Sequence, residues 1–273
     1  MSETQLPDFE NPPVVETVLG VQFEPLEKWT VAHMGAFWRQ LGEDWPTVRE
    51  QTALPDQFET FDEMEQMFVQ LRVNINKPND GRCQFIHKAN QWMVQLQNGR
   101  LHSNWLGMDG KQYPRFEACL TQFEARWQAF VDFCSGMGLG APKANQWEVT
   151  YLNLIPRGSV WNEPKDWANL LNQSLPGVRS DLPNMKLENL GGEWHFRIGE
   201  KEGRLHVRVR HVHPRRQRDP DSLELNLTAR GPMAGNGSLD DIRLGLLEGR
   251  KAIVTGFRSM SSDEALSYWR MKR

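Results

Sequence analysis

The chain has 273 residues, of which 39% are hydrophobic and 25% are charged, and its formal net charge is −3. This length and composition are typical of a globular protein with a sizeable core, and they exclude a disordered chain. Acidic side chains gather in residues 1–65 and basic ones in the remainder, which favours an electrostatically polarised surface.

The first elements in chain order are a leader, a strand and a helix. Residues 1–11 are polar and are expected to form a flexible leader. The β-branched residues of 14–23 predict a strand, which Pro25 closes. Within 29–45 apolar side chains recur every four residues, which predicts a helix. Residues 46–66 are predicted to be a loop, with a short amphipathic segment around FDEMEQMF as the alternative.

Three strands and the most strongly patterned helix follow. Strands are predicted at 68–75, 82–89 and 92–105, and the Asn98-Gly99 pair inside the last run favours a tight hairpin. A continuous apolar stripe over 113–134 predicts an amphipathic helix. Cys119 and Cys134 lie on that stripe and are interpreted as core residues. With Cys83 they are widely spaced, which favours reduced thiols and argues against a cysteine zinc site.

A similar order of elements begins again near residue 146. The predicted elements are a strand at 147–156, a helix at 164–175, strands at 186–190, 193–199, 205–213 and 222–229, and helices at 238–257 and 261–269. Ser238 with Asp241, and Ser261 with Glu264, have the spacing of a helix capping box.

This order predicts an α+β fold of two pseudo-repeated halves, residues 12–145 and 146–273, that form one continuous body. Each half is expected to place its helices on one face of a mostly antiparallel sheet. The arrangement is analogous to the TATA-binding protein or to helix-grip folds, and such an analogy carries no function.

A basic hairpin at 204–218 is the first candidate site. Leu205, Val207 and Val209 alternate with a polar row, and the neighbouring strand and the turn add further basic residues. The candidate nucleic-acid or anion-binding residues are Arg204, His206, Arg208, Arg210, Arg215, Arg216, Arg218, His195 and Arg197.

Two readings of this polar row stay open. The neighbouring strands extend it with Glu224, Asn226 and Thr228, and the first half offers Gln70, Arg72, Asn74, Gln95, Gln97, His102 and Asn104. Such a face suits base edges and phosphates, but a sheet packed on one side also exposes a merely solvated polar face. Aromatic residues are scarce on these rows, which argues against single-strand stacking.

His211 and His213 form a candidate metal pair. Two residues apart on a strand, both imidazoles point to the same face, and Asp219 or Asp221 would supply a third ligand. The alternative is that both histidines only finish the apolar face of the strand.

Known catalytic signatures are missing from the sequence. The glycine-rich stretch 230–238 lacks the Gly-Lys-Ser/Thr end of a phosphate-binding loop, and no nucleophile elbow or His-Glu-x-x-His helix occurs. We therefore expect no cofactor. Trp161 and Trp269 are candidate interface anchors, with core packing as the alternative. The acidic, polar start of the chain and the lack of a long apolar run lead us to expect a cytoplasmic protein without membrane contact.

Short motifs in a fixed order resemble an uncharacterised prokaryotic family that is sporadically distributed among bacteria and archaea. An opening Asn-Pro-Pro with a following Glu, a central Tyr-x-Asn strand and a closing Phe-loop-helix carry the resemblance. The matched residues are Asn11, Pro12, Pro13, Glu16, Tyr151, Asn153, Phe257 and Trp269. Thr150 departs from the family pattern, which usually has Arg there. The resemblance implies no established activity, and its sporadic distribution fits mobile-element or antiviral-defence loci.

The first functional hypothesis is a non-enzymatic binding or scaffold protein that acts with a partner protein or as a homo-oligomer. The alternative is a nucleic-acid-binding protein that uses the basic hairpin 204–218 and the adjoining sheet face. A metal-dependent hydrolase that uses His211 and His213 is the third hypothesis.

Overall fold

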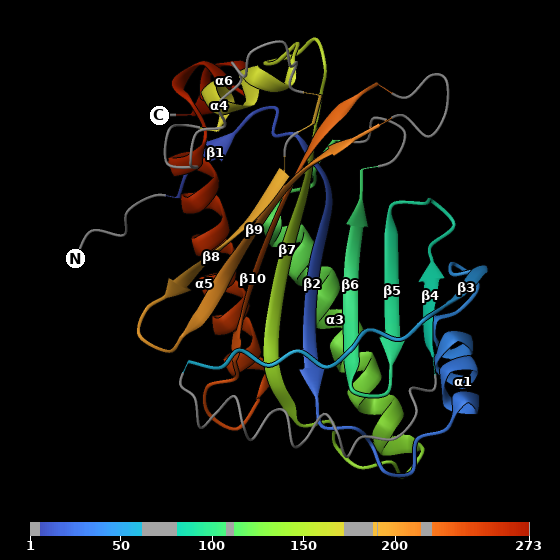
Figure 1. Ribbon diagram of the computed structural model, residues 1–273. Helices are drawn as coiled ribbons and strands as arrows, with labels where there is room; N and C mark the ends of the chain where they lie inside the picture. The colour runs from blue at the N-terminus through green and yellow to red at the C-terminus, as the bar shows by residue number, and fades with distance from the viewer. Residues whose placement is uncertain are drawn as a thin grey trace.

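The computed structural model describes residues 6–61, 81–107, 112–171, 188–189, 191–213 and 220–272. One large antiparallel sheet dominates it (Figure 1). Its strands are β2 (Val14–Phe23), β3 (Thr47–Gln51), β4 (Arg82–Ile86), β5 (Trp92–Gln97), β6 (Arg100–Leu106), β7 (Ala144–Pro156), β8 (Gly191–Ile198), β9 (Gly203–Val212) and β10 (Ser222–Pro232). Their order across the sheet is β3-β4-β5-β6-β2-β7-β10-β9-β8. The predicted α+β class is confirmed.

Two long helices cover one face of this sheet. The helices are α1 (Val31–Leu41), α3 (Phe116–Gly136), α4 (Trp167–Leu170), α5 (Leu239–Met260) and α6 (Asp263–Tyr268), and the short 3-10 helix η2 (Pro164–Asp166) precedes α4. Helix α3 packs on β2 and β6, and α5 packs on β7, β9 and β10 (Figure 1). Within the described residues, no helix is long and apolar enough to cross a bilayer.

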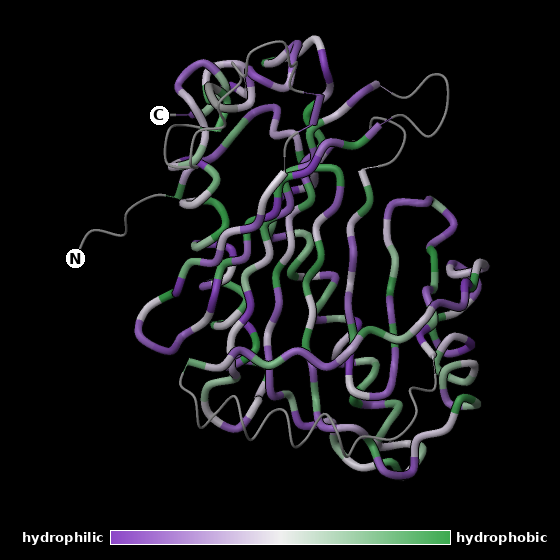
Figure 2. The backbone as a smooth tube through the Cα atoms, in the orientation of Figure 1, coloured by the Kyte–Doolittle hydropathy of each residue, from purple (hydrophilic) through white to green (hydrophobic). Residues whose placement is uncertain are grey.

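Alternation along the strands separates the two faces of the sheet. Leu223, Leu225 and Leu227 of β10 are 0% exposed, and the residues between them are polar. The tube view shows the same alternation of hydrophobic and hydrophilic residues along the central strands (Figure 2). A period of two therefore places one apolar row under the helices and leaves a polar row on the opposite face.

An aromatic cluster joins α3 to the sheet and to α1. The Phe130 ring lies 5.3 Å from that of Phe23 and 5.5 Å from that of Phe37. Cys119 and Cys134, on the same helix, are buried as predicted. Burial raises the pKa of each thiol to about 12, so both stay protonated at neutral pH.

Glycines on α5 let that helix approach β7 closely. A Cβ added at Gly245 would lie 2.3 Å from Cδ1 of Trp147, and one at Gly249 would lie 2.7 Å from Cζ3 of the same ring. Trp147 is 3% exposed and cannot move without repacking its surroundings. The absence of a side chain at these two helix positions thus fixes how closely the helix approaches the sheet.

The same substitution is expected to have opposite effects on two helices. Gly245→Ala should lower the free energy of unfolding by about 1–3 kcal/mol, because the new methyl group overpacks Trp147. In α1, a Cβ at Gly35 meets no atom within 4 Å, so Gly35→Ala should raise it by about 0.5–1 kcal/mol through helix propensity. Urea unfolding of the two variants checks the pair, and equal signs would contradict this account of the packing.

Most described elements match the sequence predictions within a few residues, and three corrections follow. Residues 47–51, predicted as loop, form strand β3, which pairs with β4 at the edge of the sheet. The cap of α6 is Ser262, whose hydroxyl accepts from the Ala265 N–H, and Ser261 instead ends α5. Trp161 and Trp269 are each 2% exposed, so they belong to the core and not to an interface.

Other predictions fall partly on residues that the structure leaves undescribed. The hairpin at Asn98-Gly99 is confirmed between β5 and β6, with Gly99 at φ +102°. The strand predicted at 68–75 lies outside the described residues. So do most of the strand at 186–190 and the end of the helix at 164–175, whose described part is only η2 and α4.

The two ends of the chain are joined. Strand β1 (Asp8–Phe9) pairs with β11 (Met271–Lys272), so the leader expected at residues 1–11 is ordered in part. Arg115 fixes this junction, because its guanidinium donates to the Asp8 carboxylate and to the Phe9 carbonyl at 3.0 and 2.7 Å. Residues 1–5 lie outside the described chain.

Candidate functional site

Polar side chains cover the face of the sheet opposite α3 and α5, which we call the polar face. Several of them are almost completely buried. The buried members are Gln22, Gln95, Gln97, Arg100, His102, Asn104, Gln146 and Glu224. Buried polar groups cost free energy unless they are hydrogen-bonded. Gln95, Asn104 and Glu224 bond to other side chains of this face, whereas several of the others have partners in another part of the chain.

Residues 52–61, which we call the strap, supply many of these partners. The strap leaves β3 and runs across the strands on the polar face, as the cyan segment in front of the sheet shows (Figure 1). The Gln97 side chain accepts from the Leu54 N–H and donates to the Leu54 carbonyl, both at 2.9 Å. Arg100 donates to the Pro55 carbonyl at 3.0 Å. Side chains of the sheet therefore bind the backbone of the strap.

The same pattern continues along the strap toward β9. The Gln22 side chain accepts from the Gln57 N–H at 2.9 Å, and Gln146 accepts from the backbone N–H of Glu59 at 3.3 Å. Arg204 of β9 donates to the carbonyl of residue 60 at 3.0 Å. Because these bonds go to the backbone, they suit an extended chain and depend little on its sequence.

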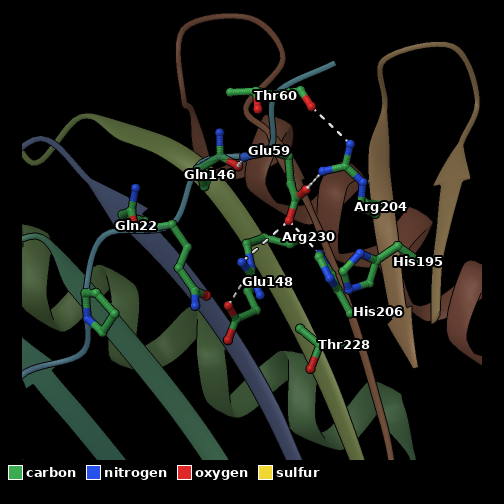
Figure 3. Close-up of polar contacts among 12 residues, drawn as sticks. Gln22, Glu59, Thr60, Gln146, Glu148, His195, Arg204, His206, Thr228 and Arg230 are labelled. Atoms are coloured by element: carbon green, nitrogen blue, oxygen red, sulfur yellow. Dashed lines mark hydrogen bonds and ion pairs between the residues drawn. The ribbon is translucent and has the colours of Figure 1, made fainter. Parts of the chain in front are cut away.

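Basic side chains of β9 and β10 enclose the side chain of Glu59, an acidic residue of the strap (Figure 3). Its carboxylate is 3% exposed and accepts from Arg204 and from His206 Nε2, the latter at 2.7 Å. Arg230 of β10 lies 3.5 Å away. Burial opposes ionisation of Glu59, but the hydrogen bond from His206 and the charges of His206, Arg230 and Arg204 outweigh it and lower its pKa.

A second buried carboxylate, Glu148 of β7, lies beneath Glu59 (Figure 3). Arg230 Nε donates to it at 2.9 Å, and His102 Nε2 lies 3.6 Å from it. Burial would raise the pKa of Glu148, but His102 in its protonated form and the positive charges of Arg230 and Arg100 lower it. Arg230 therefore bridges the two carboxylates and links the strap to the centre of the sheet.

The position of His102 depends on a glycine in the neighbouring strand. A Cβ added at Gly20 would lie 2.2 Å from Cδ2 of the imidazole. His102 is 4% exposed, and burial lowers its pKa to about 4, with the nearby Glu148 opposing that shift. The imidazole is thus neutral at pH 7.

Acid should destabilise the protein through His102. The unfolded chain binds a proton near the ordinary pKa of 6.5, whereas the folded chain does so only near 4. The stability that neutral His102 contributes is therefore present above pH 6.5 and is lost as the pH falls toward 4, by on the order of 3 kcal/mol. Urea unfolding at about pH 7 and about pH 5 should show a smaller decline for His102→Gln than for the wild type. An equal decline in both proteins would contradict this assignment.

The structure places the predicted basic row in different environments. Arg204 and His206 contact Glu59, and Arg210 Nε lies 2.5 Å from the Glu224 carboxylate. Arg208 is exposed and has no ion pair with a described residue. The nucleic-acid hypothesis stays a prediction, with part of its charge already paired inside the chain.

The remaining candidates of that set are divided. His195 Nε2 lies 3.3 Å from the Glu193 carboxylate, and its ring is 4.6 Å from that of His206. Arg197 lies over the Phe61 ring at 5.6 Å. Arg215, Arg216 and Arg218 lie outside the described residues.

The predicted metal pair converges with a carboxylate. His211 and His213 at the end of β9 meet Asp221, which directly precedes β10, and one donor atom from each lies within 4.8 Å of the others. Asp219, the other predicted third ligand, lies outside the described residues. Glu193, His195 and His206 form a second such group, but His206 is hydrogen-bonded to Glu59.

Most family-matched residues line one cavity or lie at the junction of the two chain ends. Pro12, Tyr151, Asn153 and Phe257 line a cavity of about 440 Å³ beside α5, in which the Tyr151 and Tyr113 hydroxyls are 2.9 Å apart. The cavity lies next to the junction of the two chain ends.

The other matched residues lie in three places: at the junction of the two chain ends, beside β7 and on the polar face. The Asn11 N–H donates to the Trp269 carbonyl at 3.2 Å, and the Pro13 carbonyl accepts from the Leu154 N–H at 3.0 Å. Glu16 lies on the polar face and accepts from Asn104 at 2.6 Å, and burial raises its pKa. The eight residues therefore do not form a single cluster.

Sequence reasoning missed the strap and its anchor. Glu59 lies in a segment predicted as loop, and Glu148, Gln146 and Arg230 were not among the candidates. The contrast between an acidic N-terminal part and a basic remainder was the available signal, because Glu59 belongs to the first and its partners to the second.

Comparisons with protein-family models and with curated proteins gave no match to this chain. The family resemblance noted in the sequence therefore stays a prediction.

Proposed function

We propose that this protein is a non-enzymatic binding protein that acts with a partner protein, and that its polar face receives an extended, acidic segment of that partner. The observation that carries the proposal is the way the sheet holds the strap. Gln22, Gln97, Arg100, Gln146 and Arg204 all bond to its backbone. Side chains that bond to backbone groups suit any chain in the same extended conformation.

The enclosure of Glu59 supports an acidic residue in the bound segment. Arg204, His206 and Arg230 converge on this carboxylate, and charge-assisted hydrogen bonds of this kind are among the stronger ones in proteins. A partner segment with Glu or Asp at this position would reproduce these contacts and displace the strap.

The same contacts make nucleic acid the less favoured ligand. Glu59 lies among the cations that a phosphate would need, and Arg210 is paired with Glu224. A phosphate backbone would have to displace these carboxylates before it gained its own ion pairs.

We also infer that the two halves arose by internal duplication, in an arrangement analogous to the TATA-binding protein or helix-grip folds. The order of elements supports this. Outward from the central β2–β7 pair, the strands run β6, β5, β4 on one side and β10, β9, β8 on the other. Each set of three leads into a long helix, α3 or α5, on the same face.

Titration of a labelled peptide tests the proposed function. The peptide TALPDQFETF, which copies residues 52–61, is titrated into full-length Glu59→Ala protein, whose own strap has lost its anchor. We expect saturable binding that is at least about tenfold weaker when the glutamate of the peptide is replaced by alanine.

Two further variants identify the surface that binds the peptide. Arg204→Ala added to Glu59→Ala should abolish the preference for glutamate, and Arg39→Ala, at an exposed arginine of α1, should leave binding unchanged. Absence of saturable peptide binding would refute the proposal. Tight, strongly salt-dependent binding of a single-stranded oligonucleotide to the wild type in the same assay would favour the nucleic-acid alternative.

A further inference from the structure

At the end of the β9–β10 hairpin, the buried side chain of one histidine makes no hydrogen bond to the described part of the chain. The His211 side chain is 5% exposed, and neither of its ring nitrogens makes a hydrogen bond to a described residue. Trp161 and Trp167 flank the ring edge to face, with ring centroids 6.0 and 5.1 Å away. A buried imidazole normally donates from one nitrogen and accepts at the other, so this side chain lacks partners that proteins usually supply.

The groups nearest to the His211 nitrogens are metal-ligand types. His211 Nε2 lies 3.4 Å from Oδ1 of Asp221, and His213 Nδ1 lies 3.2 Å from the same oxygen. The two imidazole rings are 4.1 Å apart. Two nitrogens and a carboxylate oxygen therefore converge on one small volume.

Hairpin register and a neighbouring loop position the carboxylate. His211 pairs with Leu223 in the ladder, which places Asp221 beside the last residues of β9. The Arg157 N–H donates to the Asp221 carbonyl at 2.7 Å, and the Arg157 guanidinium lies 3.8 Å from Oδ2. These contacts fix the ligand from its far side, as outer groups do in metal sites.

The site opens into a cavity. His211, His213 and Asp221 line a space of about 490 Å³, whose wall also includes Glu163 and Glu188. Lys165 pairs with Glu163 at 3.0 Å and Arg157 lies near Asp221, so the three carboxylates leave a small excess of negative charge, which favours a cation. His213 is 67% exposed, so its ring can adjust to close the distances around an ion.

We propose that His211, His213 and Asp221 bind a Zn²⁺-like divalent cation, with the cavity providing the remaining coordination position. Two imidazoles and one carboxylate form a donor set that suits Zn²⁺ and related transition metals better than Mg²⁺ or Ca²⁺. The proposal is independent of peptide binding on the polar face, because these residues lie on the far end of the hairpin and share none of the strap's contacts.

Metal titration of the full-length chain tests the site. Chelator-treated protein is titrated with Zn²⁺ by calorimetry and with Co²⁺ by visible absorption. We expect one equivalent to bind, and His213→Ala to weaken binding by at least about tenfold and to remove the Co²⁺ bands of a tetrahedral site. Since His213 is exposed, this variant should keep its fold, which thermal unfolding without metal verifies.

Two other variants make the assignment specific. Asp221→Asn should weaken binding as His213→Ala does, because an amide is a poor Zn²⁺ ligand. His195→Ala, in the group with Glu193 and His206, should bind Zn²⁺ like the wild type. No saturable binding by the wild type, or equal affinity in His213→Ala, would overturn the proposal. So would a loss confined to His195→Ala.

Discussion

Glu148→Ala is expected to lower the free energy of unfolding by about 3 kcal/mol, the largest effect of any substitution on the polar face. The Glu148 side chain is 15% exposed and that of Arg230 13%, so removing the carboxylate leaves a buried guanidinium with only the more distant Glu59. Breaking one partner of a buried ion pair is costly because the other charge stays desolvated.

Matched variants separate the charge from the shape. Glu148→Gln keeps the size of the side chain and a hydrogen-bond acceptor. It should therefore lower the free energy of unfolding by less than Glu148→Ala does. Glu248→Ala removes a partly exposed carboxylate that pairs with Lys251 at 3.2 Å and should change stability by less than about 0.5 kcal/mol. Urea unfolding at pH 7 measures all three. A Glu148→Ala protein as stable as Glu248→Ala would show that the buried pair contributes nothing.

Glu59→Ala is expected to release the strap and to lower the free energy of unfolding by about 2 kcal/mol. The cost is smaller than at Glu148 because Arg204 and His206 are 24% and 20% exposed and regain water when the carboxylate is removed. Without this anchor the strap loses its buried ion pair. It keeps weaker contacts, among them those with Gln22, Gln97 and Gln146 and the Arg100 and Arg204 bonds to its carbonyls.

Limited proteolysis makes the release of the strap visible. Chymotrypsin should cut at Phe58 and Phe61 much faster in Glu59→Ala than in the wild type, because local opening exposes the backbone there. Glu50→Ala removes the same charge at an exposed position of β3, just before the strap, and should be cut like the wild type. Equal cleavage rates in all three proteins would mean that Glu59 does not hold the strap.

Local periodicity explains which parts of the fold could be predicted. The stripe that includes Phe123 and Trp127 and the alternation from Leu205 to Val209 each arise within a few residues of sequence, so pattern alone predicts the elements and the buried row. The pairing of His213 with Asp221 was also within reach, since a hairpin brings the flanks of its own turn together.

The strap could not be predicted in the same way. Arg204 and Glu59 are 145 residues apart, and no periodicity marks a segment that crosses strands through side chain–backbone bonds. The alternation correctly indicated that Arg204 and His206 face away from the apolar row. Pattern could not indicate that a carboxylate from the first half would lie between them and reduce the charge of that face.

Hydrogen exchange of the strap during peptide binding tests the central claim most directly. In the wild type the N–H groups of Leu54, Gln57 and Glu59 are hydrogen-bonded to the sheet and should be protected. Excess isotope-labelled TALPDQFETF peptide, distinguishable by mass, should abolish this protection while leaving α5 protected. Peptide binding with unchanged exchange of residues 52–61 would contradict the account, because the segment would then occupy some other surface.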